Sequence, residues 1–136
     1  MASPEAVGYS LIALIRRKPG VKPQEFQDHF EVNEIPVLRK LAGDTFPLAH
    51  QRIYLKRSEE GDNPADVLVG GQEDFPFDAV VLMEFEDKAH ADRFFNLAHA
   101  EDHIRSFEVH PLMPDRSKSR GVVVSKKYIT TPTSAL

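Results

Sequence analysis

The chain has 136 residues, so we expect one domain that is large enough to bury a hydrophobic core of its own. The net charge of −4 and the scattered basic residues argue against a nucleic acid or an anionic membrane as partner. The absence of cysteine excludes disulfides and thiolate chemistry, and the sequence has no apolar run typical of a membrane span and no secretory signal, so a cytoplasmic location is expected.

The first third of the sequence predicts a strand followed by a long helix. Residues 7–16 form a nearly continuous apolar run that ends in a proline–glycine turn. The helix is expected to begin at Pro23 and to stop at Gly43, because proline suits a first helical turn and glycine suits the residue after the last one. Pro36 removes one helical hydrogen bond, so a kink or local opening is expected at residues 32–35.

One stripe of this helix is expected to face the core, if each residue advances the helix by about 100°. The stripe contains Phe26, Phe30, Val37 and Leu41. Asn33 falls inside the stripe and His29 on its border, so both could line a pocket from the helix side. The alternative for His29 is a boundary residue that hydrogen-bonds a backbone carbonyl. For Glu34 we favour a surface ion pair with Arg39 or Lys40.

The rest of the sequence predicts a second helix and three more strands. The helix is expected to be capped by Asp87 and to continue, with a break, to about Glu108. The loop of residues 58–76 is long for a compact domain, and its segment Val67–Val69 is expected to dock back on the body. The strands are expected at residues 46–57, 77–85 and 120–127.

In this order the elements give the βαββαβ topology of a ferredoxin-like α+β domain. The domain is expected to span residues 1–128, with a C-terminal tail at 129–136 that could extend onto a partner. Two helices would cover one face of the sheet. The first and third strands alternate poorly between apolar and polar residues, so the other face is apolar as well and needs a second cover. The sequence therefore predicts a homodimer in which two sheets pack face to face.

Several segments, taken together, are characteristic of one family. They are Lys18-Pro19-Gly20 followed by Phe26, residues 31–36, residues 46–54, Phe77-Asp78 and Asp115-Arg116-Ser117. Over residues 8–127 the chain resembles the EthD-domain proteins of the dimeric α+β barrel superfamily, and it is most similar to the fungal branch that tailors polyketides. The resemblance implies a small homodimer with a pocket between sheet and helices in each subunit, and no cofactor.

The same resemblance implies lyase chemistry in secondary metabolism, since relatives resemble decarboxylases, dehydratases or cyclases of aromatic polyketides. More distant relatives resemble cofactor-free anthrone oxygenases. The sequence departs from the family pattern at two places. Many relatives carry a histidine just before the helix proline, where this chain has Glu34, and an Asp-Glu pair before the last strand, where this chain has Val109-His110. If those positions carry the chemistry, it has been rewired or lost in this chain.

The second predicted strand carries the clearest candidates for catalysis. His50, Arg52 and Tyr54 share one face of it, because side chains alternate along a strand. An imidazole titrates near neutrality, so His50 is a candidate proton-transfer group, and His29 is the second one. Arg52 could hold a carboxylate or enolate oxygen, and Tyr54 could donate to a carbonyl. The alternative is a polar strand face that is exposed to water.

Other residues are candidates for contact with the substrate or a metal. His99 and His103 have the spacing of two metal ligands on a helix, but no third ligand is identified and a solvated helix end is favoured, so no metal is predicted. Aromatic side chains suit the wall of a pocket for an aromatic ring. The remaining candidate substrate contacts are Asn33, Tyr9, Phe30 and His110.

Three hypotheses about function remain at this point. The preferred one is a cofactor-independent lyase, a decarboxylase or dehydratase/cyclase, that acts on an aromatic polyketide-type acid by histidine acid–base chemistry. The second is a cofactor-free anthrone-type monooxygenase. The third is a non-catalytic homodimer that binds a small molecule, which the missing family histidine before Pro36 favours.

Overall fold

The computed structural model describes residues 3–4 and 8–133, with side chains described from residue 8 onward. Its main sheet has four antiparallel strands in the order β3-β4-β2-β5. The strands are β2 (Tyr9–Ile15), β3 (Ala49–Tyr54), β4 (Ala79–Phe85) and β5 (Arg120–Val124). All four predicted strands are present with shorter bounds, and their order is that of a ferredoxin-like fold.

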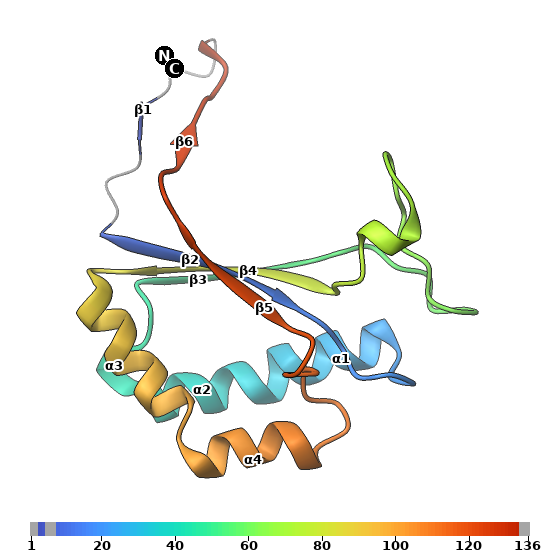
Figure 1. Cartoon of the computed structure of the whole chain (residues 1–136), viewed down its shortest axis with the longest axis horizontal. Helices are drawn as coiled ribbons and strands as arrows, with labels where there is room; N and C mark the ends of the chain where they lie inside the picture. Colours follow the sequence, from blue (N-terminus) through green and yellow to red (C-terminus); the bar gives the residue numbers. More distant parts are fainter. Residues whose placement is uncertain (1–2, 5–7, 134–136) are drawn as a thin grey trace.

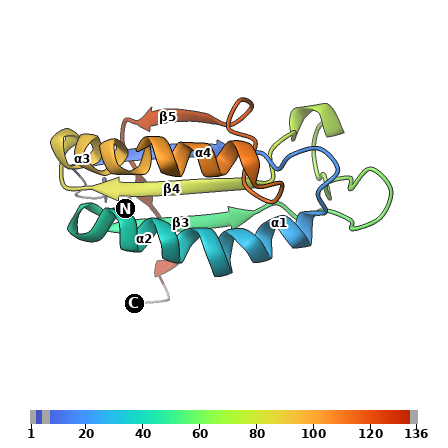
Figure 2. The same cartoon turned by 90° about the horizontal axis from the view of Figure 1, so that it is seen from below.

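The helices all lie on one face of this sheet (Figures 1 and 2). The first helical stretch has three parts, α1 (Pro23–His29), the π-helical turn η1 (Phe30–Glu34) and α2 (Ile35–Ala42). The second stretch has two, α3 (Lys88–Ala98) and α4 (Glu101–Val109). Two 3₁₀ turns, η2 (Gly43–Thr45) and η3 (Gln72–Asp74), lie in the connections. None of the helices in the described part of the chain is long and apolar enough to cross a membrane.

The two ends of the described chain meet in a separate two-stranded ribbon. β1 (Ser3–Pro4) pairs antiparallel with β6 (Tyr128–Ile129). In Figure 1 this ribbon rises on the side of the sheet opposite to the helices. The start of the first predicted strand, Val7, and the last three residues of the predicted tail lie outside the described residues.

The core lies between the sheet and the helices, because the strands place alternate residues on that side. In β4, Ala79, Val81, Met83 and Phe85 are buried toward the helices. Asp87 caps α3 as predicted, since its carboxylate accepts the His90 amide hydrogen at 2.7 Å. Gly43 ends α2 with a positive φ of 58°, as expected of a glycine in that place.

The turn η1 explains why part of the predicted helical stripe is wrong. The Ile35 amide donates to the Phe30 carbonyl, so this turn closes over one residue more than an α-helical turn. It confirms the local opening predicted before Pro36. The additional residue rotates everything after it, so that Leu38 is buried (8 % exposed) whereas Val37 is 54 % exposed. Leu41 is likewise exposed, and Ala42 takes its buried place.

Of the apolar segment Val67–Val69 in the loop of residues 58–76, only Val67 is partly buried, so the prediction that the segment docks on the body is wrong for its other two residues. Leu68 and Val69 are 95 % and 83 % exposed. The loop is nevertheless well braced at its base, where the Arg57 guanidinium donates to the carbonyls of Phe75 and Phe77. In Figure 1 the loop projects beyond one end of the sheet, and its upper part rises on the side opposite to the helices.

The phase shift at η1 gives a direct test by mutation. Leu38→Ala should lower the free energy of unfolding by about 2–4 kcal/mol, because it opens a cavity in the core. Val37→Ala, the matched control one residue earlier, should change it by less than about 1 kcal/mol. Urea unfolding followed by circular dichroism measures both. A larger loss for Val37→Ala than for Leu38→Ala would mean that the helix keeps a regular phase through Pro36.

Candidate functional site

A cavity of about 200 Å³ lies between the sheet and the helices. Its walls come from β2, β4, η1, α2, α3 and α4, and they are mostly apolar. The apolar and aromatic lining residues are Ala13, Ile15, Phe30, Leu38, Val81, Met83, Phe94, Phe95, Ala98, Ile104, Phe107 and Pro114. An apolar protein cavity of about 150 Å³ can hold benzene, so this one suits a single substituted ring.

Six polar residues complete the lining of this cavity, and only two of them are exposed. His99 and Arg116 are the exposed ones, so they mark the mouth. The others, Glu34, His50, His103 and Ser119, are at least half-buried. The Ser119 hydroxyl is already engaged, since it accepts from the Arg16 amide and donates to the Asp115 carbonyl.

Glu34 and His103 form a buried pair in the wall of the cavity. The Glu34 Oε2 atom lies 2.9 Å from His103 Nε2, and the two side chains are only 5 % and 8 % exposed. The surface ion pair predicted for Glu34, with Arg39 or Lys40, is therefore wrong. The cause is η1, because its additional residue turns Glu34 inward and leaves Asn33 exposed.

The hydrogen bonds of His103 fix where the proton of this pair can be. Nδ1 lies 2.6 Å from the Ala98 carbonyl oxygen, and a carbonyl only accepts, so Nδ1 carries a hydrogen. The contact between Nε2 and Glu34 then needs one further proton, held by either partner. Burial raises the pKa of Glu34, while the neighbouring His103 lowers it in part. The pair thus holds one transferable proton inside an apolar cavity.

His50 reaches the same cavity from the edge strand β3, as the sequence predicted for its face of the strand. Burial, and to a smaller degree the charge of Arg52, lowers the pKa of His50 to about 4. Its Nδ1 lies 3.2 Å from Arg52 Nη1, which can only donate, so the hydrogen of the neutral ring is on Nε2. Near neutral pH this imidazole is uncharged.

Arg52 and Tyr54 share that strand face but are held by a residue that the sequence analysis missed. Glu31 accepts two hydrogen bonds from Arg52, at 2.7 and 2.9 Å, and one from the Tyr54 hydroxyl at 2.5 Å. These bonds, first that from Arg52, keep the pKa of Glu31 below its ordinary value. Burial and the bond to Glu31 raise the pKa of Tyr54. Neither Arg52 nor Tyr54 lines the cavity, and their contact with a substrate stays a prediction.

The other predicted site residues are distributed around the cavity and outside it. Phe30 lines the cavity, as expected of an aromatic wall. Tyr9 packs against the core without lining it. Asn33 is exposed, contrary to the prediction that it faces the core. His29 does not line the cavity and stacks on His110, with 4.4 Å between ring centroids. The structure therefore unites His50 with Glu34 and His103 instead of with His29.

His99 and His103 do not act as a pair on one helix. The chain breaks between α3 and α4, so His99 ends one helix while His103 lies on the next. The solvated position favoured for His103 is wrong, since its ring is buried against Glu34. Among the described residues, no group of three His, Asp or Glu side chains is arranged to hold a metal ion.

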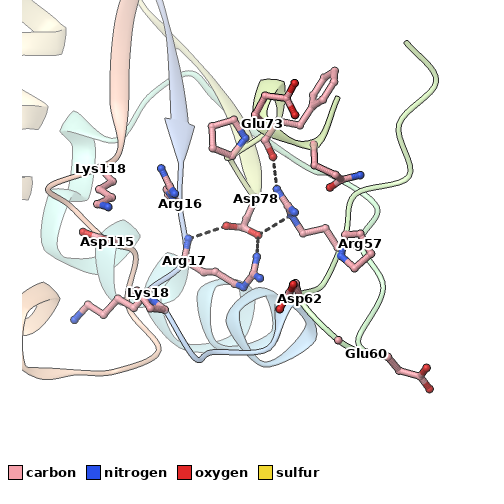
Figure 3. A pocket seen from close by; sticks show the side chains of 16 residues that line it. Arg16, Arg17, Lys18, Arg57, Glu60, Asp62, Glu73, Asp78, Asp115 and Lys118 are labelled. Atoms are coloured by element: carbon pink, nitrogen blue, oxygen red, sulfur yellow. Dashed lines mark hydrogen bonds and ion pairs between the residues drawn. The ribbon is translucent and has the colours of Figure 1, made fainter. Parts of the chain in front are cut away.

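A larger open cleft of about 950 Å³ lies where β2 ends and β4 begins (Figure 3). Five basic and five acidic residues line it, so it has no charge preference. Arg17 and Arg57 both point to the buried Asp78, which binds each of them. Lys18 donates to the carbonyls of Phe107 and His110 at the end of α4. These charges brace the loop and the helix end, and we assign no reaction to them.

The fold is that of a ferredoxin-like α+β protein, and three titratable side chains, Glu34, His50 and His103, line its cavity between sheet and helices. The EthD domain family matches residues 18–117, and the chain belongs to that family. No curated protein matches the sequence.

Solved structures resemble the fold at low sequence identity. A NIPSNAP-like domain protein from Burkholderia xenovorans has 17 % identity and a TM-score of 0.51, over 91 % of this chain and 89 % of that one. An "ethyl tert-butyl ether d" (EthD) family protein from Bacillus halodurans has 10 % identity and a TM-score of 0.49, over 88 % and 99 %. At these identities the likeness concerns the fold alone.

The raised pKa of Glu34 predicts an unusual pH dependence of stability. The folded protein keeps this proton above the ordinary value of 4.5, so the contribution of Glu34 to the free energy of unfolding falls as pH rises beyond 4.5. Glu34→Gln should remove that fall. Glu31→Gln is the matched control, because Glu31 should give the opposite pH dependence. Its lowered pKa stabilises the folded protein above pH 4.5, and this contribution is lost as pH falls below 4.5.

Urea unfolding of the wild type and both variants, from about pH 3 to pH 8, measures these contributions. A difference between wild type and Glu34→Gln that stays constant with pH would contradict a raised pKa for Glu34.

Proposed function

We propose that the protein is a cofactor-independent lyase that decarboxylates or dehydrates a small aromatic polyketide-type acid. The observation that supports this most is the buried Glu34–His103 pair beside neutral His50 in an apolar cavity of ring size. Acid–base catalysis needs one group that gives a proton and one that takes it, within reach of the same ring. Burial is the largest cause of the shifted pKa of both Glu34 and His50.

For a decarboxylation, the atoms balance without any other reactant. The pair delivers its proton to the ring carbon that bears the carboxylate. The bond from that carbon to the carboxylate then breaks, its electron pair stays with the ring, and carbon dioxide leaves. The positive charge that the ring gains with the proton is thereby neutralised, and His50 Nε2–H can donate to a ring oxygen and hold the ring in position. Water returns the proton to the Glu34–His103 pair.

The family departure at Glu34 fits this proposal. Relatives with a histidine before the helix proline would place an imidazole at the position of Glu34. In this chain Glu34 meets the imidazole of His103, which comes from α4. In the proposed chemistry the imidazole thus comes from a second helix. The missing family histidine before Pro36 is then no longer an argument for a non-catalytic protein.

Two criteria distinguish the lyase from the competing oxygenase, namely the size of the cavity and the requirement for dioxygen. About 200 Å³ suits one substituted ring better than the three fused rings of an anthrone. A decarboxylation or dehydration proceeds without dioxygen, whereas an oxygenase requires it. The non-catalytic hypothesis expects a bound aromatic ligand and no product.

Mutation of the cavity residues tests the proposed function. With a panel of aromatic polyketide-type acids, in air and under nitrogen, mass spectrometry should detect loss of carbon dioxide or water in both atmospheres. His103→Gln, Glu34→Gln and His50→Gln should each lower turnover by about 10²–10⁴-fold, because each removes a proton-transfer group. His29→Gln is the matched control, since its ring lies outside the cavity.

Three outcomes of that experiment would overturn parts of the proposal. Oxygen-dependent product would move the assignment to an oxygenase. A collapse of turnover in His29→Gln alone would restore His29 as the catalytic histidine. Full activity of His103→Gln and Glu34→Gln would remove the pair from the mechanism.

We also propose that the functional unit is a homodimer formed through the open face of the sheet. This face carries Ile12 and Leu14 from β2, Val80 and Leu82 from β4, and Val122 from β5, and no helix of the described chain covers it (Figure 1). An apolar face of this extent is typical of an interface.

A single charge in the open face tests the dimer. Val122 is 61 % exposed in the single chain, so Val122→Glu should leave the fold intact but place a carboxylate in the proposed interface. We expect a dimer for the wild type and a monomer for Val122→Glu by light scattering after size exclusion. Val37→Glu, equally exposed on the helix side, should remain a dimer. A monomeric wild type would sink the proposal.

A further inference from the structure

Arg116 has a position that no other cation in the described chain shares. It lines the mouth of the cavity, and no other arginine or lysine lines that cavity. The other exposed lining residue is His99, whose pKa is lowered first by burial and second by the nearby charge of Arg116. The mouth is therefore positively charged, whereas the interior is apolar.

The guanidinium of Arg116 is not engaged by the described residues. It makes no hydrogen bond and no ion pair with them, although acidic Glu108 and Asp115 line the adjoining hollow. Asp115 instead accepts the hydroxyl hydrogen of Ser117 at 2.7 Å. Arg52, the arginine that the sequence favoured for a carboxylate, is occupied by Glu31.

We propose that Arg116 is the anchoring residue for a carboxylate on the ligand of this cavity. The inference deepens the proposed function and rests on it, because it names the charge that the aromatic substrate carries. A guanidinium presents two parallel N–H donors that match a carboxylate, and it stays charged at every physiological pH. The apolar walls then receive the ring that follows the carboxylate inward.

The anchor also orients the ligand relative to the proton-transfer groups. His50 belongs to β3 and Arg116 to the loop that leads into β5, which are opposite edges of the sheet. Three strand spacings, about 14 Å, separate those edges. Glu34 and His103 face the sheet from the helix layer between them. A ligand held at Arg116 thus extends along the cavity past the Glu34–His103 pair toward His50.

Binding of a charged probe and its uncharged analogue tests the anchor separately from turnover. The probes are 2,4-dihydroxybenzoate and its methyl ester, which differ in charge at one group. Calorimetry or NMR titration of the wild type should give tighter binding of the acid. Arg116→Ala should weaken binding of the acid by roughly fivefold, which corresponds to the energy of an exposed ion pair, and should leave binding of the ester unchanged. Arg116→Lys should recover part of the loss.

The matched control is Arg93→Ala, because Arg93 is exposed on α3 and does not line the cavity. The proposal is overturned if Arg116→Ala binds acid and ester in the wild-type ratio, if Arg93→Ala shows the same loss, or if neither probe binds the wild type. Charge-selective binding that depends on Arg116, without any turnover, would refute the lyase and leave the anchor standing.

Discussion

The structure depends on one turn of helix that holds an additional residue. Pro36 offers no amide hydrogen, and the chain accommodates it by closing η1 through the bond from Ile35 to Phe30. A buried carboxylate is costly unless it is paired, and the turn places Glu34 where His103 can pair with it. That contact joins α4 to the first helical stretch and places a titratable pair in the cavity wall.

Two carboxylates three residues apart have opposite environments as a result. Glu31 faces the edge strand, where Arg52 and Tyr54 hold it as an anion with a lowered pKa. Glu34 faces the cavity, where burial raises its pKa. Environments that push two such pKa values apart separate a structural anion from a group that can carry a proton. The first fixes the helix to the sheet, and the second pairs with His103 in the cavity wall.

The chain belongs to the EthD family, and the resemblance to that family can be compared with the observed cavity. The resemblance implied a pocket between sheet and helices, and a cavity lies there. The departure at Glu34 leads to His103, a residue outside the motifs that carry the resemblance. The buried acid Glu34 thus has its partner on another helix.

The sequence by itself determined the order of strands and helices, the family, the cap at Asp87 and the opening before Pro36. The family rests on the resemblance of several motifs, and the other features follow from local rules, namely alternation in strands, capping chemistry and the missing amide of proline. His50 and Phe30 were also found in this way.

Only the tertiary structure decided which residues meet in the cavity. The wheel of an ideal helix placed Val37, Leu41 and Asn33 inward, and one additional residue in η1 replaced them with Leu38, Ala42 and Glu34. The sequence did not indicate His103 as a partner of Glu34 in the cavity, because the two residues are 69 positions apart. Glu31 was missed for the same reason, since its bonds cross from helix to strand. Pairings of this kind depend on the packing of separate elements, which no local pattern records.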